Sequence, residues 1–272
     1  AAGDAGQTHQ RGVPPMEDVL SFAATIAREA GSLLKHAFET PHRITYKGDI
    51  NIVTEADLMA ENHLRERIRA RFPAHDILAE ESADAGTGAE DRWIVDPLDG
   101  TTNYAHGYPV FCVSVALEHR GQIVLGVVHN PMLDECFSAL RGGGAFLNGR
   151  SLSVSRTDAL TRSLLATGFP YDIRESRDNN LDHFETLALK AQAIRRAGSA
   201  ALDLAYVAAG RFDGFWELKL APWDTAAGWL LVEEAGGRVT DLDGGPYHLH
   251  APHILASNGT IHPALLELLR QT

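Results

Sequence analysis

The feature that most constrains this 272-residue chain is an apolar strand that runs directly into an acidic turn at residues 93–103. The apolar run Trp93–Val95 predicts a short strand, and Asp96 and Asp99 follow it three residues apart. Pro97 stiffens the turn between them, so we expect both carboxylates to point into the same space. Oxygen ligands of this kind suit a hard cation such as Mg2+.

The residues that surround the second carboxylate predict a phosphate site beside this cation. The carbonyl group of Leu98 can serve as a third oxygen ligand. Gly100, Thr101 and Thr102 supply backbone N–H groups at an expected helix start, where a phosphate group can bind. The alternative is a plain Asp-Gly turn followed by a threonine helix cap, which needs no ligand. The spacing alone leaves both interpretations open.

Two further acidic segments favour the metal interpretation. Glu80 and Glu81 follow the apolar run Ile77–Ala79, so they also lie at the end of an expected strand. Asp224 lies in the first turn of an expected helix of small residues. On its own, an aspartate at that place would be an ordinary N-cap, and the same residue can equally supply a carboxylate to a metal site.

The rest of the chain predicts a mixed α/β protein. Helical spacing of apolar residues predicts helices at residues 14–38, 54–72, 180–191, 199–209, 224–235 and after Pro263. Extended segments are expected at residues 110–117, 123–129, 135–140, 164–167, 212–217 and 254–257. We therefore expect a flexible arm at residues 1–12, an α+β domain with the acidic motif at 13–155, and an α/β substrate-recognition domain at 156–272.

Composition argues against several classes of partner. The net charge of −12 leaves no evident basic face, so neither nucleic acid nor an anionic membrane surface is an expected partner. No run of about 18 apolar residues predicts a membrane span. Cys112 and Cys136 lie in apolar runs and predict buried free thiols. With no recognisable signal peptide, these thiols indicate a cytoplasmic protein.

Two segments of the chain together resemble a known family. Residues 96–103 (DPLDGTTN) and 223–228 (WDTAAG) are similar to the two signatures of the inositol monophosphatase family. Members of this family are Mg2+-dependent, lithium-sensitive phosphatases of sugar phosphates. The resemblance covers roughly residues 16–269. It implies the layered α/β/α/β/α sugar-phosphatase fold, a homodimer, and a small phosphate monoester as the substrate.

The resemblance implies a site for two or three Mg2+ ions. The implied ligands are Glu80, Asp96, the Leu98 carbonyl, Asp99 and Asp224. The resemblance, and not the spacing, selects the first of the two adjacent glutamates. Two cations of this kind neutralise the charge of a phosphate monoester and lower the pKa of a bound water, so no covalent nucleophile is needed.

The resemblance also assigns the groups that act on water and phosphate. Glu80 and Thr101 would orient the attacking water, and Asp57 would form a hydrogen bond with Thr101. The alternative for Asp57 is the third position of an approximate capping box that begins at Thr54, and the two roles are compatible. The N–H groups of Gly100 and Thr101 would hold the phosphate group.

Substrate selection is expected in the second half of the chain. The resemblance implies that Gly198, Ser199 and Ala200 line the pocket for the sugar ring and that Glu217 accepts hydrogen bonds from its hydroxyl groups. Lys219 either meets a second anionic group or is simply solvated, and we favour the second interpretation. Close-spaced histidines at His248, His250 and His253 could hold a transition metal, but we expect them to be surface residues of a loop.

The favoured activity is Mg2+-dependent hydrolysis of myo-inositol 1-phosphate or a close polyol monophosphate. Histidinol phosphate, fructose 1,6-bisphosphate and 3′-phosphonucleotides are alternative substrates within the family. Trp223 differs from the tyrosine usual in histidinol-phosphate members, and residues 221–222 differ from the nucleotide phosphatases. A catalytically weak relative that acts as a regulatory binding protein is the alternative from another class, and the complete set of acidic ligands disfavours it.

Overall fold

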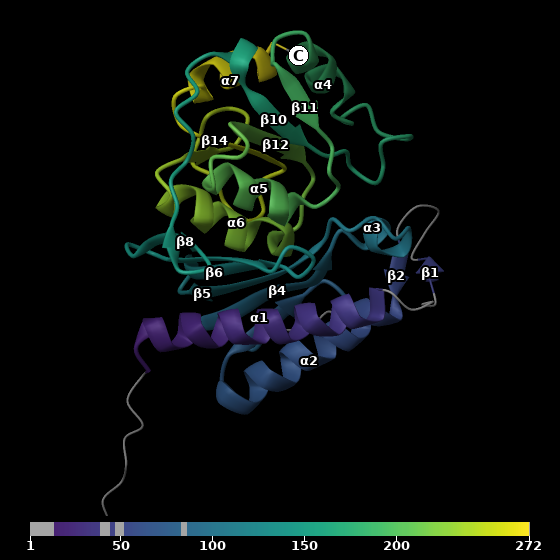
Figure 1. The fold of residues 1–272 in the computed structure, drawn as a ribbon, viewed down its shortest axis with the longest axis vertical. Helices are drawn as coiled ribbons and strands as arrows, with labels where there is room; N and C mark the ends of the chain where they lie inside the picture. The colour runs from purple at the N-terminus through teal and green to yellow at the C-terminus, as the bar shows by residue number, and fades with distance from the viewer. Residues whose placement is uncertain (1–13, 39–43, 47–51, 83–85, 272) are drawn as a thin grey trace, which may run out of the picture.

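The computed structural model describes residues 14–38, 44–46, 52–82 and 86–271, so the arm expected at residues 1–12 lies outside the described residues. The described elements stack in five layers (Figure 1). From bottom to top, these are a helix pair, a seven-stranded sheet, a second helix pair, a five-stranded sheet and a third helix pair. The expected α/β/α/β/α fold is therefore confirmed.

The helix pairs come from widely separated parts of the chain. Helices α1 and α2 cover one face of the larger sheet, α5 and α6 lie between the two sheets, and α4 and α7 cover the far face of the smaller sheet (Figure 1). Their bounds are α1 Met16–Phe38, α2 Glu55–Arg71, α4 Leu181–Ala188, α5 Ala200–Ala208, α6 Pro222–Glu234 and α7 His262–Leu269. Among the residues that the structure describes, no helix combines the length and the apolar character needed to cross a bilayer.

The larger sheet has the strand order β3-β4-β5-β6-β7-β8-β9. Every neighbouring pair is antiparallel except β3 and β4, so the larger sheet is antiparallel with one parallel edge strand. A hairpin turn at Arg120 and Gly121 joins β5 and β6, and both turn residues have positive φ. The strands are β3 Asp76–Ala79, β4 Asp91–Asp99, β5 Cys112–His119, β6 Gln122–Asn130, β7 Glu135–Leu140, β8 Gly144–Leu147 and β9 Arg150–Ser151.

The smaller sheet has the strand order β11-β10-β12-β14-β13. Strand β10 is parallel to both of its neighbours, whereas β14 is antiparallel to β12 and to β13. Its strands are β10 Leu164–Thr167, β11 Ala193–Arg195, β12 Gly214–Leu218, β13 Arg238–Thr240 and β14 His253–Ser257. The remaining short elements are β1 Ile44–Tyr46, β2 Ile52–Thr54, α3 Thr101–Ala105 and a 3-10 turn at Leu160–Arg162.

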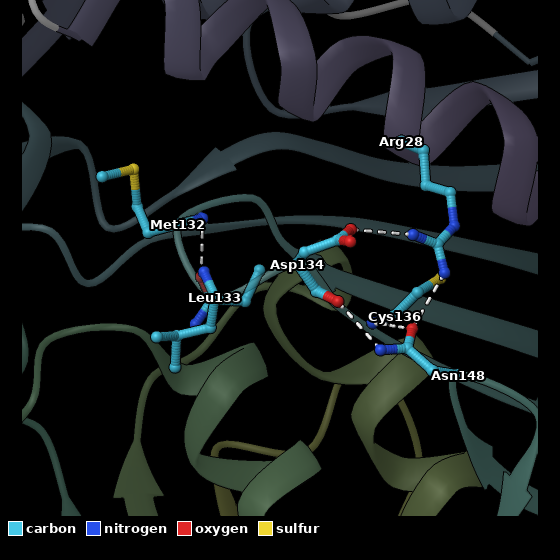
Figure 2. Close-up of polar contacts among 7 residues, drawn as sticks. Arg28, Met132, Leu133, Asp134, Cys136 and Asn148 are labelled. Atoms are coloured by element: carbon cyan, nitrogen blue, oxygen red, sulfur yellow. Dashed lines mark hydrogen bonds and ion pairs between the residues drawn. The ribbon is translucent and has the colours of Figure 1, made fainter.

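Helix α1 is fixed to the turn between β6 and β7 by a polar cluster (Figure 2). Arg28 donates one hydrogen bond to Asp134 at 3.0 Å and another to the side-chain oxygen of Asn148 at 2.9 Å. Asn148 in turn accepts from the Cys136 backbone and donates to the Asp134 carbonyl. Exposed pairs of this kind stabilise a protein by at most about 1 kcal/mol. Most of the attachment of α1 therefore comes from its buried apolar face.

The middle helix layer approaches the larger sheet very closely. A Cβ atom added to Gly126 of β6 would lie 2.8 Å from the Cα atom of Ala227 in α6. Another added to Gly228 would lie 2.5 Å from the Cβ atom of Leu204 in α5. Both glycines therefore permit a separation that no larger residue allows. This packing holds the first turns of α5 and α6 beside the end of β4, where the acidic motif lies.

Several predicted boundaries need correction. The strand expected to end at Val95 continues through Asp99, and its register with β5 shifts between Asp96 and Asp99. The expected turn at Pro97 is therefore an irregularity within a strand, which tolerates a residue without an N–H donor. Helix α6 begins at Pro222, earlier than expected, because proline suits the first helical turn. Strands β8, β9, β11 and β13 were not predicted, since each has at most four residues.

Candidate active site

Three carboxylates from distant parts of the chain converge at the end of β4. Asp96, Asp99 and Asp224 each offer one oxygen, and these oxygens lie within 4.8 Å of one another. Asp96 and Asp99 are buried, with exposed fractions of 1% and 9%. Among the described residues, no other group of three or more histidine, cysteine or acidic side chains has such geometry. The structure therefore brings together the three aspartates that the sequence predicts as metal ligands.

The electrostatics of this group favour a bound cation. Burial raises the pKa of Asp96 well above its ordinary value, and the nearby charges of Glu80, Asp99 and Asp224 raise it further. Burial also raises the pKa values of Asp99 and Asp224. A divalent cation removes this mutual repulsion, and oxygen-only donors are those that Mg2+ prefers. The residues present thus fit the Mg2+ ions implied by the resemblance.

The orientation of each aspartate is fixed by hydrogen bonds. The Ser199 hydroxyl and the Ala201 backbone N–H, both at the start of α5, donate to Asp99 Oδ2 at 2.7 and 2.8 Å. Asp96 Oδ1 accepts the Leu98 N–H at 3.0 Å. Asp224 is not the N-cap that its position in the sequence suggested: Ala221 is the N-cap of α6, and Asp224, the third helical residue, accepts the Ala221 N–H through Oδ2 at 2.7 Å. Each contact occupies one oxygen of Asp96 or of Asp224, so the second oxygen of each can bind a metal ion, and capping and metal binding are compatible.

A hydrogen-bond chain links α2 to the predicted phosphate site. Thr101 Oγ1 lies 2.9 Å from Asp57 Oδ1 and 3.1 Å from the Leu98 carbonyl oxygen. The hydrogen bond predicted between Asp57 and Thr101 is therefore present, and Asp57, on α2, is fully buried. The side chain of Thr54, the expected start of the capping box, lies outside the described residues.

The turn before α3 depends on a glycine. Gly100 has φ 102°, a left-handed conformation that other residues rarely adopt. An added Cβ atom there would also lie 2.9 Å from the Val110 carbonyl oxygen. A side chain at this position would therefore strain the turn that presents the N–H groups of Gly100 and Thr101.

A cavity of about 330 Å³ opens beside the three carboxylates. Most of the predicted site residues line it, namely Asp99, Gly100, Thr101, Gly198, Ser199, Ala200, Glu217 and Asp224. The other predicted residues adjoin this lining: Asp57 and the Leu98 carbonyl contact Thr101, and Asp96 groups with Asp99 and Asp224. The charge of Glu80 raises the pKa of Asp96, so Glu80 also lies near this group. The sequence-predicted residues thus form one site.

Comparison with known proteins decides which family has this arrangement. Residues 15–272 match the family model described as the inositol monophosphatase family. The chain belongs to the inositol monophosphatase family. It is 48% identical over 230 residues to the inositol-1-monophosphatase of Rhizobium meliloti (strain 1021), with 84% of this chain and 86% of that protein covered.

Two further similarities place this inositol monophosphatase family member among its relatives. It is 43% identical over 258 residues to the Nus factor SuhB of Escherichia coli (strain K12), with 94% of this chain and 97% of that protein covered. The solved structure of an inositol monophosphatase from Anabaena (Nostoc) sp. PCC 7120 has 46% identity and a TM-score of 0.87 over 94% of this chain and 97% of that chain. The family and fold implied by the two sequence motifs are confirmed.

The cavity also contains residues that sequence reasoning missed. Tyr171, Arg196 and Asp203 line it, although no motif marks them. Tyr171 is 61% exposed, yet partial desolvation and the charges of Glu80 and Asp224 raise the pKa of its phenol, which places that phenol near the acidic cluster. Asp203 lies in the apolar segment 200–208, where a lone acidic residue is the one signal that could have drawn attention to it.

Two other predictions concern residues at the edge of the site. Lys219 is not simply solvated, because its ammonium group lies 2.8 Å from Asp172 Oδ2 and 2.9 Å from Ser176 Oγ. This pairing ties the end of β12 to the segment that carries Tyr171. His248 and His250 are exposed, as expected for surface residues of a loop. His253 is partly buried and lies 3.7 Å from Asp178, and none of the three belongs to a metal-binding group of the described residues.

Proposed function

We propose that this protein hydrolyses myo-inositol 1-phosphate, or a close polyol monophosphate, to the free polyol and phosphate in a Mg2+-dependent reaction. The observation that carries the proposal is the convergence of Asp96, Asp99 and Asp224 beside a cavity that Asp99 and Asp224 line. Glu80, the three aspartates and the Leu98 carbonyl would hold two or three ions. Bound Mg2+ supplies charge neutralisation for the phosphoryl oxygens and lowers the pKa of a water molecule.

The residues of the chain would orient the attacking water and hold the phosphate. Thr101 has one hydroxyl proton, and the buried carboxylate of Asp57 is placed to accept it. The Thr101 oxygen then remains an acceptor for a proton of the water, and Glu80 would accept the other. The N–H groups of Gly100 and Thr101 would bind the phosphate oxygens at the start of α3.

The far part of the cavity would bind the polyol. Gly198, Ser199 and Ala200 form one wall, and Glu217 lines the cavity with an exposed fraction of only 9%. A buried carboxyl group that faces a cavity is suited to form hydrogen bonds with substrate hydroxyls. A cavity of about 330 Å³ has the size expected for a small monoester.

A substrate panel tests this proposal. The purified protein with Mg2+ is assayed for phosphate release from myo-inositol 1-phosphate, histidinol phosphate, fructose 1,6-bisphosphate and a 3′-phosphonucleotide. We expect the highest kcat/KM for inositol phosphate, and inhibition by lithium. A higher kcat/KM for histidinol phosphate would refute the substrate assignment.

The metal assignment is tested separately with Asp96→Asn. This variant is expected to stay folded and to lose turnover, because it removes a charge from the centre of the carboxylate group. The control is Asp158→Asn, which removes the same charge from an exposed pair with Arg162. Near-normal Mg2+-dependent turnover in Asp96→Asn would show that the site is wrong.

The relatives named Nus factor SuhB support a second candidate, the regulatory binding role. In that case the protein acts through a macromolecular partner, and hydrolysis is secondary. A strain that lacks the gene distinguishes the two functions when it is supplied with Asp96→Asn. Rescue by this variant favours the binding role, whereas failure to rescue favours hydrolysis.

Homodimer formation and a cytoplasmic location complete the proposal. Sedimentation tests the first, and cell fractionation tests the second.

A further inference from the structure

The cavity contains a buried acidic group that the proposed mechanism does not use. Asp203 lies on α5, lines the cavity and has an exposed fraction of 1%. Its Oδ1 atom is buried and has no hydrogen-bond partner. An unsatisfied polar group in the interior costs about 1–3 kcal/mol or more. An apolar residue would suit this position on the buried helix better, so a role for the carboxyl group outside the fold itself is indicated.

A second buried carboxyl group shares the cavity with Asp203. Glu217 on β12 lies against Gly168, where an added Cβ atom would be 2.1 Å from Glu217 Oε1. Asp203 Oδ1 has no hydrogen-bond partner, and the pKa of Glu217 is raised by burial and by the charge of Asp99 with no hydrogen bond to offset it. The charge of Glu217 raises the pKa of Asp203, so the two groups lie near each other. The polyol end of the cavity therefore has two acidic walls, one from α5 and one from β12.

The two groups are not part of the cation site. The metal-binding geometry among the described residues comprises Asp96, Asp99 and Asp224 and includes neither Asp203 nor Glu217. The exposed guanidinium group of Arg196 lies close enough to affect both carboxyl groups, yet it makes no hydrogen bond to either. Their hydrogen-bonding capacity is thus available to a ligand that enters the cavity.

We propose that Asp203 is a second hydroxyl-binding residue of the substrate pocket, and that Asp203 and Glu217 together select phosphate esters with two free hydroxyl groups beyond the ester. The inference rests on the proposed function, because it concerns the polyol part of the same substrate. Each hydroxyl group of a polyol is both a donor and an acceptor, and a carboxyl group can satisfy it from one side. A substrate without these hydroxyls leaves both buried groups unsatisfied and is therefore rejected.

Two variants remove the carboxyl group in different ways. Asp203→Ala shortens the side chain. Asp203→Leu keeps its branched shape and suits an apolar helix, so a folded variant is available. The assay compares kcat/KM for myo-inositol 1-phosphate with kcat/KM for phenyl phosphate, which has the ester but no hydroxyl groups. We expect both variants to lose about 10- to 100-fold on inositol phosphate and less than about twofold on phenyl phosphate.

A conservative variant and a double variant sharpen the result. Asp203→Asn keeps two hydrogen-bonding atoms, and we expect it to retain more activity on inositol phosphate than Asp203→Ala. Combining Asp203→Ala with Glu217→Gln is expected to cost less than the product of the two separate losses, because both residues bind one substrate. Circular dichroism of each variant confirms that the fold is kept.

Three outcomes would overturn the inference or its basis. An equal loss on both substrates means that Asp203 supports the fold or the metal ligands, and an unchanged kcat/KM on both means that it contacts no substrate. Either result overturns the inference while the wild-type preference for inositol phosphate, and so the proposed function, still stands. If the wild-type protein itself shows no preference for inositol phosphate over phenyl phosphate, the proposed function fails first.

Discussion

The substitution Glu217→Gln is expected to stabilise the metal-free protein at neutral pH, even though it damages the proposed substrate pocket. Burial raises the pKa of Glu217 from 4.5 to about 8, with a further contribution from the charge of Asp99. The unfolded chain has no such burial and releases the proton at the ordinary pKa. Folding above that pH therefore requires the wild-type protein to bind a proton, which costs free energy.

The magnitude follows from the difference between the two pKa values. Each pH unit between the unfolded and folded pKa costs about 1.4 kcal/mol. At pH 7 the wild-type protein is roughly 2.5 units above the unfolded value, so the cost is about 3 kcal/mol. Below pH 4 the group is protonated in both states, and the cost disappears. Glutamine at this position carries no charge and avoids the cost at every pH.

Urea unfolding with a chelator present measures this difference. The free energy of unfolding of Glu217→Gln is expected to exceed that of the wild-type protein by about 3 kcal/mol at pH 7 and to match it near pH 4. Glu175→Gln, at an exposed position, is the control and is expected to change stability by less than about 0.5 kcal/mol. A stability difference that does not vary with pH would refute the reasoning, because uptake of a proton by Glu217 would then not be its cause.

Three other perturbations test the site and its supports. In a thermal-shift assay, Mg2+ at about 100 times its Kd is expected to stabilise the wild-type protein by about 2.7 kcal/mol, and Asp96→Asn is expected to lose most of this gain. Gly126→Ala is expected to cost about 1–3 kcal/mol in urea unfolding, because its Cβ atom would lie 2.8 Å from Ala227 Cα and force β6 and α6 apart. Gly168→Ala would displace the Glu217 carboxylate, so the preference for inositol phosphate over phenyl phosphate should fall while phenyl phosphate turnover persists.

The long elements of the fold were predictable because their apolar periodicity extends over many residues. The helix expected at residues 14–38 is observed at Met16–Phe38, and the strand expected at 135–140 has those same bounds. Strands of two to four residues, such as β9 and β11, carry too little pattern to be recognised. Their pairing depends on neighbours that are distant in the sequence or on a short turn, and no local signal records those contacts.

The proposed metal ligands were predictable for a different reason from the residues of the pocket. Asp96 and Asp99 lie in one short motif, so their proximity follows from the chain itself, and the family resemblance supplies Asp224. Asp203 and Tyr171 reach the same cavity from α5 and from the segment after β10, and only tertiary packing brings them there. Catalytic groups fixed by local geometry thus leave a sequence signature, whereas groups that shape the substrate pocket do not.

We expect the two domains predicted on either side of residue 155 to unfold as one unit, and calorimetry tests this. The middle helix layer, α5 and α6, packs with Ile94 and Phe137 of the larger sheet and with Phe215 and Ile254 of the smaller sheet in one core. Exposing either sheet would therefore uncover the same apolar layer, so we expect one transition with equal calorimetric and van't Hoff enthalpies. Two resolved transitions, or a folded fragment of residues 156–272 alone, would show that each sheet keeps a core of its own.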